Sequence, residues 1–129
     1  MSTELELLVW SAVLALVQML LAVVGAQTQV GLTRLAGNRE GMPALSGWAA
    51  RAQRAHLNML ESLVIFAIAV LVAHVAGQTN ETTALGAMLF FWARLAYALV
   101  YVVGVPWLRT AVWAVSLAGI LLIIKELLL

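Results

Sequence analysis

The chain has 129 residues, of which 64% are hydrophobic and 10% charged, and its mean hydropathy is +1.03. These values exclude an ordinary soluble domain, in which about 25% of the residues are charged. The net charge of +1 comes from scattered cations, so no basic tract is available for nucleic acid. The absence of cysteine excludes disulfides and thiolate metal ligands. We therefore expect an integral membrane protein without a metal site.

Four apolar segments follow one another, each long enough for a membrane span of about 20 residues. The glycine-rich stretch from Arg34 to Gly47 predicts a loop, and Gly104 with Pro106 predicts a break. The sequence thus predicts an all-α integral membrane four-helix up-down bundle that forms one domain over residues 1–129. We expect its helices at about 4–33, 47–76, 81–103 and 106–128.

The arginines are unevenly distributed between the connections. Arg34, Arg39, Arg51 and Arg54 lie in or next to the first connection, and Arg109 lies beside the third. The N-terminal segment and the second connection carry acidic residues instead. The positive-inside rule therefore predicts that the first and third connections are cytoplasmic and that both termini lie outside.

Four polar residues share one face at the start of the second expected helix. Arg51, Arg54, Asn58 and Glu61 stand at spacings i, i+3, i+7 and i+10. A charge at the bilayer centre costs about 2.5–3.5 kcal/mol, so such a stripe indicates either a ligand site or a structural lock. In the second interpretation Glu61 is buried and paired with an arginine of another helix. Arg51 alone is equally well explained as an interfacial anchor.

The third and fourth helices add further polar groups. Arg94, Tyr97 and Tyr101 form a single face, with Arg94 near mid-membrane, and Arg109 and Thr110 open the fourth helix. Fixed cations with hydroxyl donors predict a pocket for an anionic ligand. Four helices enclose little volume, so we expect this pocket between chains of an oligomer, open to a second substrate and to lipid from the bilayer.

Two of these motifs resemble a known family. Residues 51–61, RAQRAHLNMLE, resemble the signature of the MAPEG family, the membrane-associated proteins in eicosanoid and glutathione metabolism, which includes microsomal glutathione transferases. The spacing Arg94-x-x-Tyr97-x-x-x-Tyr101 resembles its leukotriene C4 synthase branch. Arg54-Ala-His56-x-Asn58 resembles its prostaglandin E synthase branch. The chain resembles a bacterial-type member of this family.

The resemblance implies a homotrimer that binds glutathione between subunits near the cytoplasmic face of a bacterial inner membrane. It implies that Arg109 is catalytic and stabilises the glutathione thiolate. The remaining residues would bind the tripeptide: Arg54, Asn58 and Glu61 directly, Arg51 in support, Arg94, Tyr97 and Tyr101 from an adjacent chain, and His56 and Arg34 as further contacts. On an ideal helical wheel, however, His56 points about 160° away from Arg54.

The chain also departs from both branches. The spacing from Tyr101 to Arg109 is one residue longer than in the leukotriene branch and one shorter than in the prostaglandin branch, and Thr110 is an alternative thiol partner. The resemblance therefore implies a membrane-bound glutathione transferase or peroxidase for a lipophilic electrophile, without identifying the substrate.

Two other interpretations are a small four-helix transporter and a non-catalytic membrane scaffold of the same fold. A small multidrug-type transporter needs a glutamate in its first helix, whereas residues Leu7 to Thr33 carry no charge. A scaffold would show no turnover with a broad panel of electrophiles.

Overall fold

The computed structural model describes residues 1–129, apart from the side chain of Val102. Its helices are α1 (Thr3–Val30), α2 (Leu32–Ala36), α3 (Gly47–Val75), α4 (Glu81–Val103) and α5 (Pro106–Leu128). Within the described part, four of these helices, all except α2, are long and apolar enough to cross a membrane. The predicted all-α four-helix bundle is therefore confirmed.

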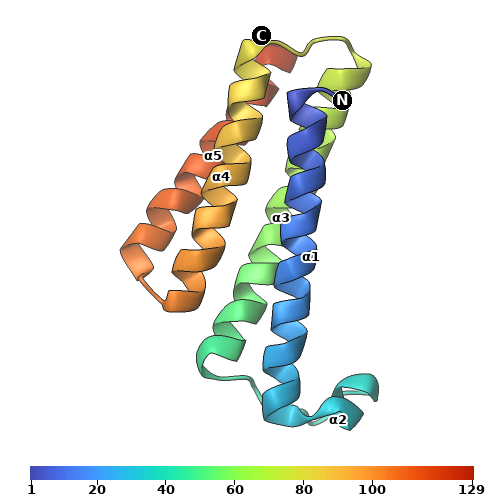
Figure 1. Cartoon of the computed structure of the whole chain (residues 1–129), viewed down its shortest axis with the longest axis vertical. Coiled ribbons are helices and arrows are strands. Elements are labelled where there is room, and N and C mark those ends of the chain that lie inside the picture. Colours follow the sequence, from blue (N-terminus) through green and yellow to red (C-terminus); the bar gives the residue numbers. More distant parts are fainter.

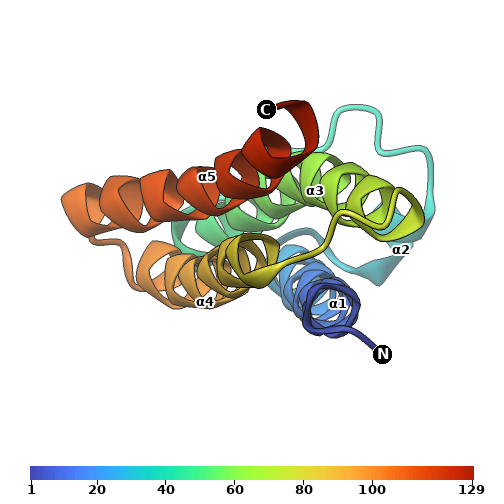
Figure 2. The same cartoon turned by 90° about the horizontal axis from the view of Figure 1, so that it is seen from above.

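The four long helices alternate in direction (Figure 1). Both termini and the α3–α4 turn lie at one end of the bundle, which we call the termini end. The α1–α3 connection and the α4–α5 turn lie towards the other end, which we call the arginine end. Seen from above, α1 and α4 form one layer and α3 and α5 the other (Figure 2). The most extensive packing is between α4 and α5 and between α1 and α3.

Local sequence signals explain where the helices begin. The Ser2 hydroxyl accepts a hydrogen bond from the N–H of Leu5 and caps α1. Asn80 and Thr83 form a reciprocal capping box at the start of α4. Pro106 occupies the first turn of α5, where a missing N–H breaks no helical hydrogen bond.

The first helix is shorter than the sequence predicts. We expected it to reach residue 33, but α1 ends at Val30 because Gly31 adopts φ +84°, a conformation that other residues rarely take. The expected loop also begins within the short helix α2. A glycine with a positive φ can thus end a helix before the apolar segment that contains the glycine comes to its end.

Small residues bring α4 and α5 into backbone contact in the half near the termini end. A Cβ added at Gly86 would lie 2.5 Å from the carbonyl oxygen of Gly119, and one added at Gly119 would lie 2.5 Å from that of Gly86. Membrane helices pack through small residues because apolar burial alone does not favour protein over lipid. These two glycines therefore fix the distance between the helices.

The termini end also carries a buried polar contact. Glu4 is buried near the start of α1, and its carboxylate accepts a 3.1 Å hydrogen bond from the hydroxyl of Thr83 in the first turn of α4. This contact fixes the two parallel helices, α1 and α4, at the same height along the bundle.

In the bundle interior the rings of Phe66 and Phe90 stack with centroids 4.0 Å apart.

Candidate functional site

Three helices meet around one tyrosine at the arginine end. The Nε of Arg54 on α3 donates a 3.0 Å hydrogen bond to the hydroxyl of Tyr101 on α4. The guanidinium carbon of Arg109 on α5 lies 4.7 Å from the centroid of the same ring, within the range of a cation–π contact. Two cations from separate helices, Arg54 and Arg109, thus converge on one tyrosine. We call these three side chains the Tyr101 cluster.

The tight turn between α4 and α5 brings Tyr101 and Arg109 into contact. Gly104 ends α4 in the left-handed conformation with φ +93°, and Pro106 starts α5 two residues later. The last turn of α4, which carries Tyr101, therefore faces the first turn of α5, which carries Arg109. Arg51 lies beside the same turn, because a Cβ added at Gly104 would stand 3.6 Å from its Nε.

The Tyr101 cluster has an excess of positive charge. Among the residues that the structure describes, neither Arg54 nor Arg109 is paired with a carboxylate. Arg54 is exposed, while Arg109 and Tyr101 are half-buried. The guanidinium groups therefore have N–H donors available for an anion, and Arg54 is accessible from outside the chain.

Arg94 and the two tyrosines form a continuous stack along α4. The guanidinium carbon of Arg94 lies 4.1 Å from the Tyr97 ring centroid, and the rings of Tyr97 and Tyr101 are 5.3 Å apart. The spacing predicted this shared face. Tyr97 is 4% and Arg94 only 1% exposed, so a ligand on the open side of the single chain reaches Tyr101 and not Arg94.

The guanidinium of Arg94 has no hydrogen-bond partner within the described residues. All three of its nitrogens are buried and unpaired, as are Oε1 of Gln18 on α1 and Oδ1 of Asn58 on α3. Buried polar groups in proteins are nearly always satisfied by protein or water, so each of these donors and acceptors is expected to gain a partner in the assembled protein or from internal water. Gln18 was not among the predicted site residues, although a single amide side chain in a long apolar segment often marks a functional position.

Asn58 and Glu61 continue the α3 stripe beyond Arg54. Asn58 is half-buried and Glu61 is exposed. Within the single chain Glu61 is therefore not buried, so its role as a buried lock, which would need an arginine of a neighbouring chain, stays a prediction. Glu61 remains accessible to a ligand or to a neighbouring chain.

His56 and Arg34 lie apart from the Tyr101 cluster of their own chain. His56 lines a groove of about 380 Å³ between α1, α2 and α3, together with Arg39 and Gln53. Its Nδ1 is buried and has no hydrogen-bond partner among the described residues. Arg34 is exposed on α2. The helical wheel, which places His56 on the opposite side of the helix from Arg54, thus predicts the position of His56 better than the sequence motif does.

Tyr101 and Thr110 each have a partner within the chain. Tyr101 accepts its hydrogen bond from Arg54 of the same chain, while its contact with a ligand held by an adjacent chain, which the resemblance implies, stays a prediction. Thr110, the alternative thiol partner, is exposed, and its hydroxyl donates to the Pro106 carbonyl oxygen at 3.3 Å. Among the described residues, no group of three or more histidine or acidic side chains could hold a metal ion.

Comparison with known proteins gives one match. The model of the MAPEG family matches residues 7–129, nearly the whole chain. No curated protein and no solved structure matches the chain significantly.

Proposed function

Because the chain belongs to the MAPEG family, we propose that it is a membrane-bound glutathione transferase or peroxidase. Its second substrate is a lipophilic electrophile or peroxide that arrives from the bilayer. The observation that carries the proposal is the Tyr101 cluster, where Arg54 and Arg109 from two helices flank the hydroxyl and ring of one tyrosine.

The cluster suits the chemistry of glutathione. The tripeptide carries two carboxylates, amide groups and a thiol, and arginine binds carboxylates through paired N–H donors. Arg54 is exposed and in position to hold a carboxylate, with Arg51 beside it. Asn58 and Glu61 follow on the same helix and offer partners for the amides and the ammonium group.

Arg109 is our candidate for thiol activation. A free thiol has a pKa of about 8.5, and a fixed cation beside the sulfur favours the thiolate, which is the attacking form. The thiol proton passes to solvent, and the sulfur then forms a C–S bond while the leaving group departs with its electron pair. With a peroxide, two glutathione molecules reduce the O–O bond and leave as the disulfide.

We further propose that a neighbouring subunit of a homotrimer completes the site. In a single chain the cluster is open, Glu61 is exposed, and His56 lies on a different face of α3 from the cluster. A second chain that places its α1–α3 groove against the cluster brings His56 and one further cation, Arg39, to the ligand. Such a site between subunits uses both faces of α3, one from each chain.

A glutathione titration of the purified protein in detergent tests the binding site. We expect Arg54→Ala to weaken affinity at least about tenfold, because a hydrogen bond to a charged group contributes about 1.5–3 kcal/mol. Lys125→Ala is the matched control, since this cation lies in the last turn of α5 at the termini end and should leave affinity unchanged. Wild-type affinity in Arg54→Ala contradicts the proposal.

A further inference from the structure

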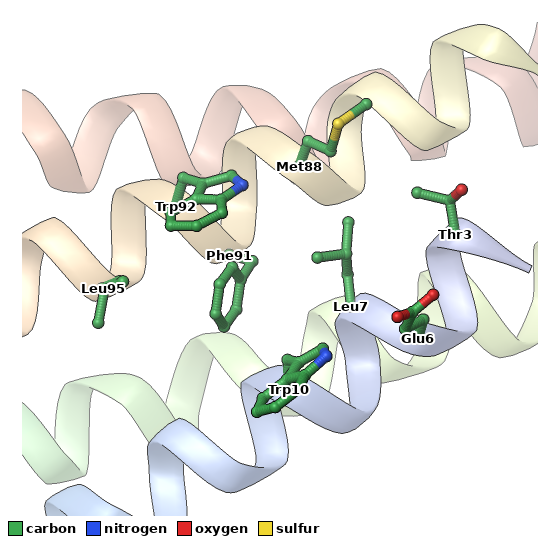
Figure 3. A pocket seen from close by; sticks show the side chains of 8 residues that line it. All are labelled: Thr3, Glu6, Leu7, Trp10, Met88, Phe91, Trp92 and Leu95. Carbon is green, nitrogen blue, oxygen red and sulfur yellow. The ribbon is translucent and has the colours of Figure 1, made fainter.

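A second candidate site lies in the other half of the molecule, away from the Tyr101 cluster. A groove of about 480 Å³ runs between α1 and α4 (Figure 3). Thr3 and Glu6 lie at its termini end, and Leu95 lies at its deep end. Its volume falls within the range of about 300–1,000 Å³ that is typical of small-molecule sites.

The depth of the groove follows from the contact between α1 and α4. The hydrogen bond from Thr83 to Glu4 places these two residues at the same level. Leu95 follows Thr83 on α4 by 12 residues, which at 1.5 Å per residue is about 18 Å. The apolar core of a bilayer is about 30 Å thick, so the groove extends from the membrane surface to beyond its middle. This length suits one alkyl chain.

Aromatic side chains dominate the wall of the groove. Trp10 on α1 faces Phe91 on α4, and Trp92 lies beside them (Figure 3). Trp10 is 53% and Trp92 60% exposed, so both rings are available to a ligand. Interfacial anchoring does not explain Trp92, which follows Thr83 by nine residues and therefore lies about 14 Å below that level.

The charge at the mouth of the groove selects the head group of the ligand. Glu6 supplies a carboxylate and Thr3 a hydroxyl, and none of the residues that line the groove is a cation. A phosphate or sulfate would be repelled by the Glu6 carboxylate, whereas an ammonium group is attracted by Glu6 and by the ring of Trp10, one helical turn further along α1. We infer that this groove binds a single-chain amphiphile with an ammonium head group.

The inference does not depend on glutathione chemistry. The groove and the Tyr101 cluster share no residue. Loss of glutathione binding in Arg54→Ala should therefore leave amphiphile binding intact. The two proposals can accordingly fail separately.

Tryptophan quenching by brominated alkyl chains tests the groove. The full-length protein in nanodiscs of zwitterionic lipid is titrated with a brominated dodecyltrimethylammonium and, separately, with the corresponding alkyl sulfate. We expect saturable quenching at a concentration roughly tenfold lower for the ammonium compound, as a cation–π contact and an ion attraction imply. The double variant Trp10→Leu/Trp92→Leu should remove most of the saturable signal, whereas Trp107→Leu, at the arginine end, should retain it.

The role of the carboxylate is tested by a matched pair of variants. Glu6→Gln should abolish the preference for the ammonium chain, whereas Glu81→Gln, an exposed acid in the first turn of α4 that does not line the groove, should keep it. Equal affinity of the ammonium and sulfate chains for the wild-type protein overturns the inference. An absence of saturable quenching also overturns it and indicates that a second copy of the chain covers the groove.

Discussion

Near the termini end α4 and α5 meet through backbone atoms at Gly86 and Gly119, whereas at the arginine end they meet through the side chains of Tyr101 and Arg109. Backbone contact leaves no room for a ligand and fixes the geometry of the helix pair. The side-chain contact keeps exposed N–H donors that a ligand can use. One half of this helix pair therefore serves stability, and the other half can serve binding.

The largest effect is expected from breaking the rigid half. Gly119→Val places side-chain atoms against the Gly86 carbonyl oxygen and the Phe90 amide, so we expect the bundle to lose about 3 kcal/mol or more. Thermal unfolding in detergent measures the loss. Ala118→Val is the control, because Ala118 is exposed and should tolerate the added methyl groups. Equal melting temperatures for the two variants would show that the glycine contact does not hold the helices together.

A smaller effect, on binding and not on stability, is expected at the arginine end. Tyr101→Phe keeps the ring beneath Arg109 but removes the hydroxyl to which Arg54 donates. We expect glutathione affinity to fall about tenfold with an unchanged melting temperature, because the position of Arg54 is no longer fixed. Tyr97→Phe, which removes a hydroxyl from a ring 4% exposed, should have less effect on affinity. A larger loss of glutathione affinity in Tyr97→Phe than in Tyr101→Phe would argue against Tyr101 as the centre of the site.

The smallest effect on affinity is expected at Arg94, which lies behind the tyrosines. Its guanidinium is buried and unpaired among the described residues, so Arg94→Met removes a charge that is costly to bury and should maintain or raise the melting temperature. Affinity for glutathione should fall by about threefold, which corresponds to under 1 kcal/mol, because Tyr97 loses its cation–π contact. A large loss of both stability and affinity would instead indicate that Arg94 has a partner in the assembled protein.

Sequence patterns predicted the helices well because hydropathy and length determine membrane spans. The break at Gly31 was missed because the apolar run continues past it. Helical spacing also predicted that Arg94, Tyr97 and Tyr101 share a face, since such periodicity is local. It did not predict that Arg94 is buried behind the tyrosines while Arg54 reaches Tyr101 in its own chain. The burial of Arg94 and the contact between Arg54 and Tyr101 depend on how the helices pack against one another, which the periodicity of a single helix does not predict.

The polar residues of α3 lie on two different faces of the helix. The motif over residues 51–61 groups His56 with Arg54 in sequence, but helical geometry separates them by more than a quarter turn. In the structure His56 joins Arg39 and Gln53 in a different groove. Arg54 and His56 of one chain therefore face different sides of the helix. Both residue types can contact one ligand when Arg54 comes from one chain and His56 from its neighbour, as we propose.

The most direct test of the account is the ultraviolet absorbance of the thiolate when glutathione binds at neutral pH. We predict a thiolate signal for the wild-type protein and its loss in Arg109→Ala, with glutathione affinity lowered much less than in Arg54→Ala. Thr110→Ala should retain the signal. An undiminished thiolate signal in Arg109→Ala would contradict the assignment of Arg109 as the cation that activates the thiol at the arginine end.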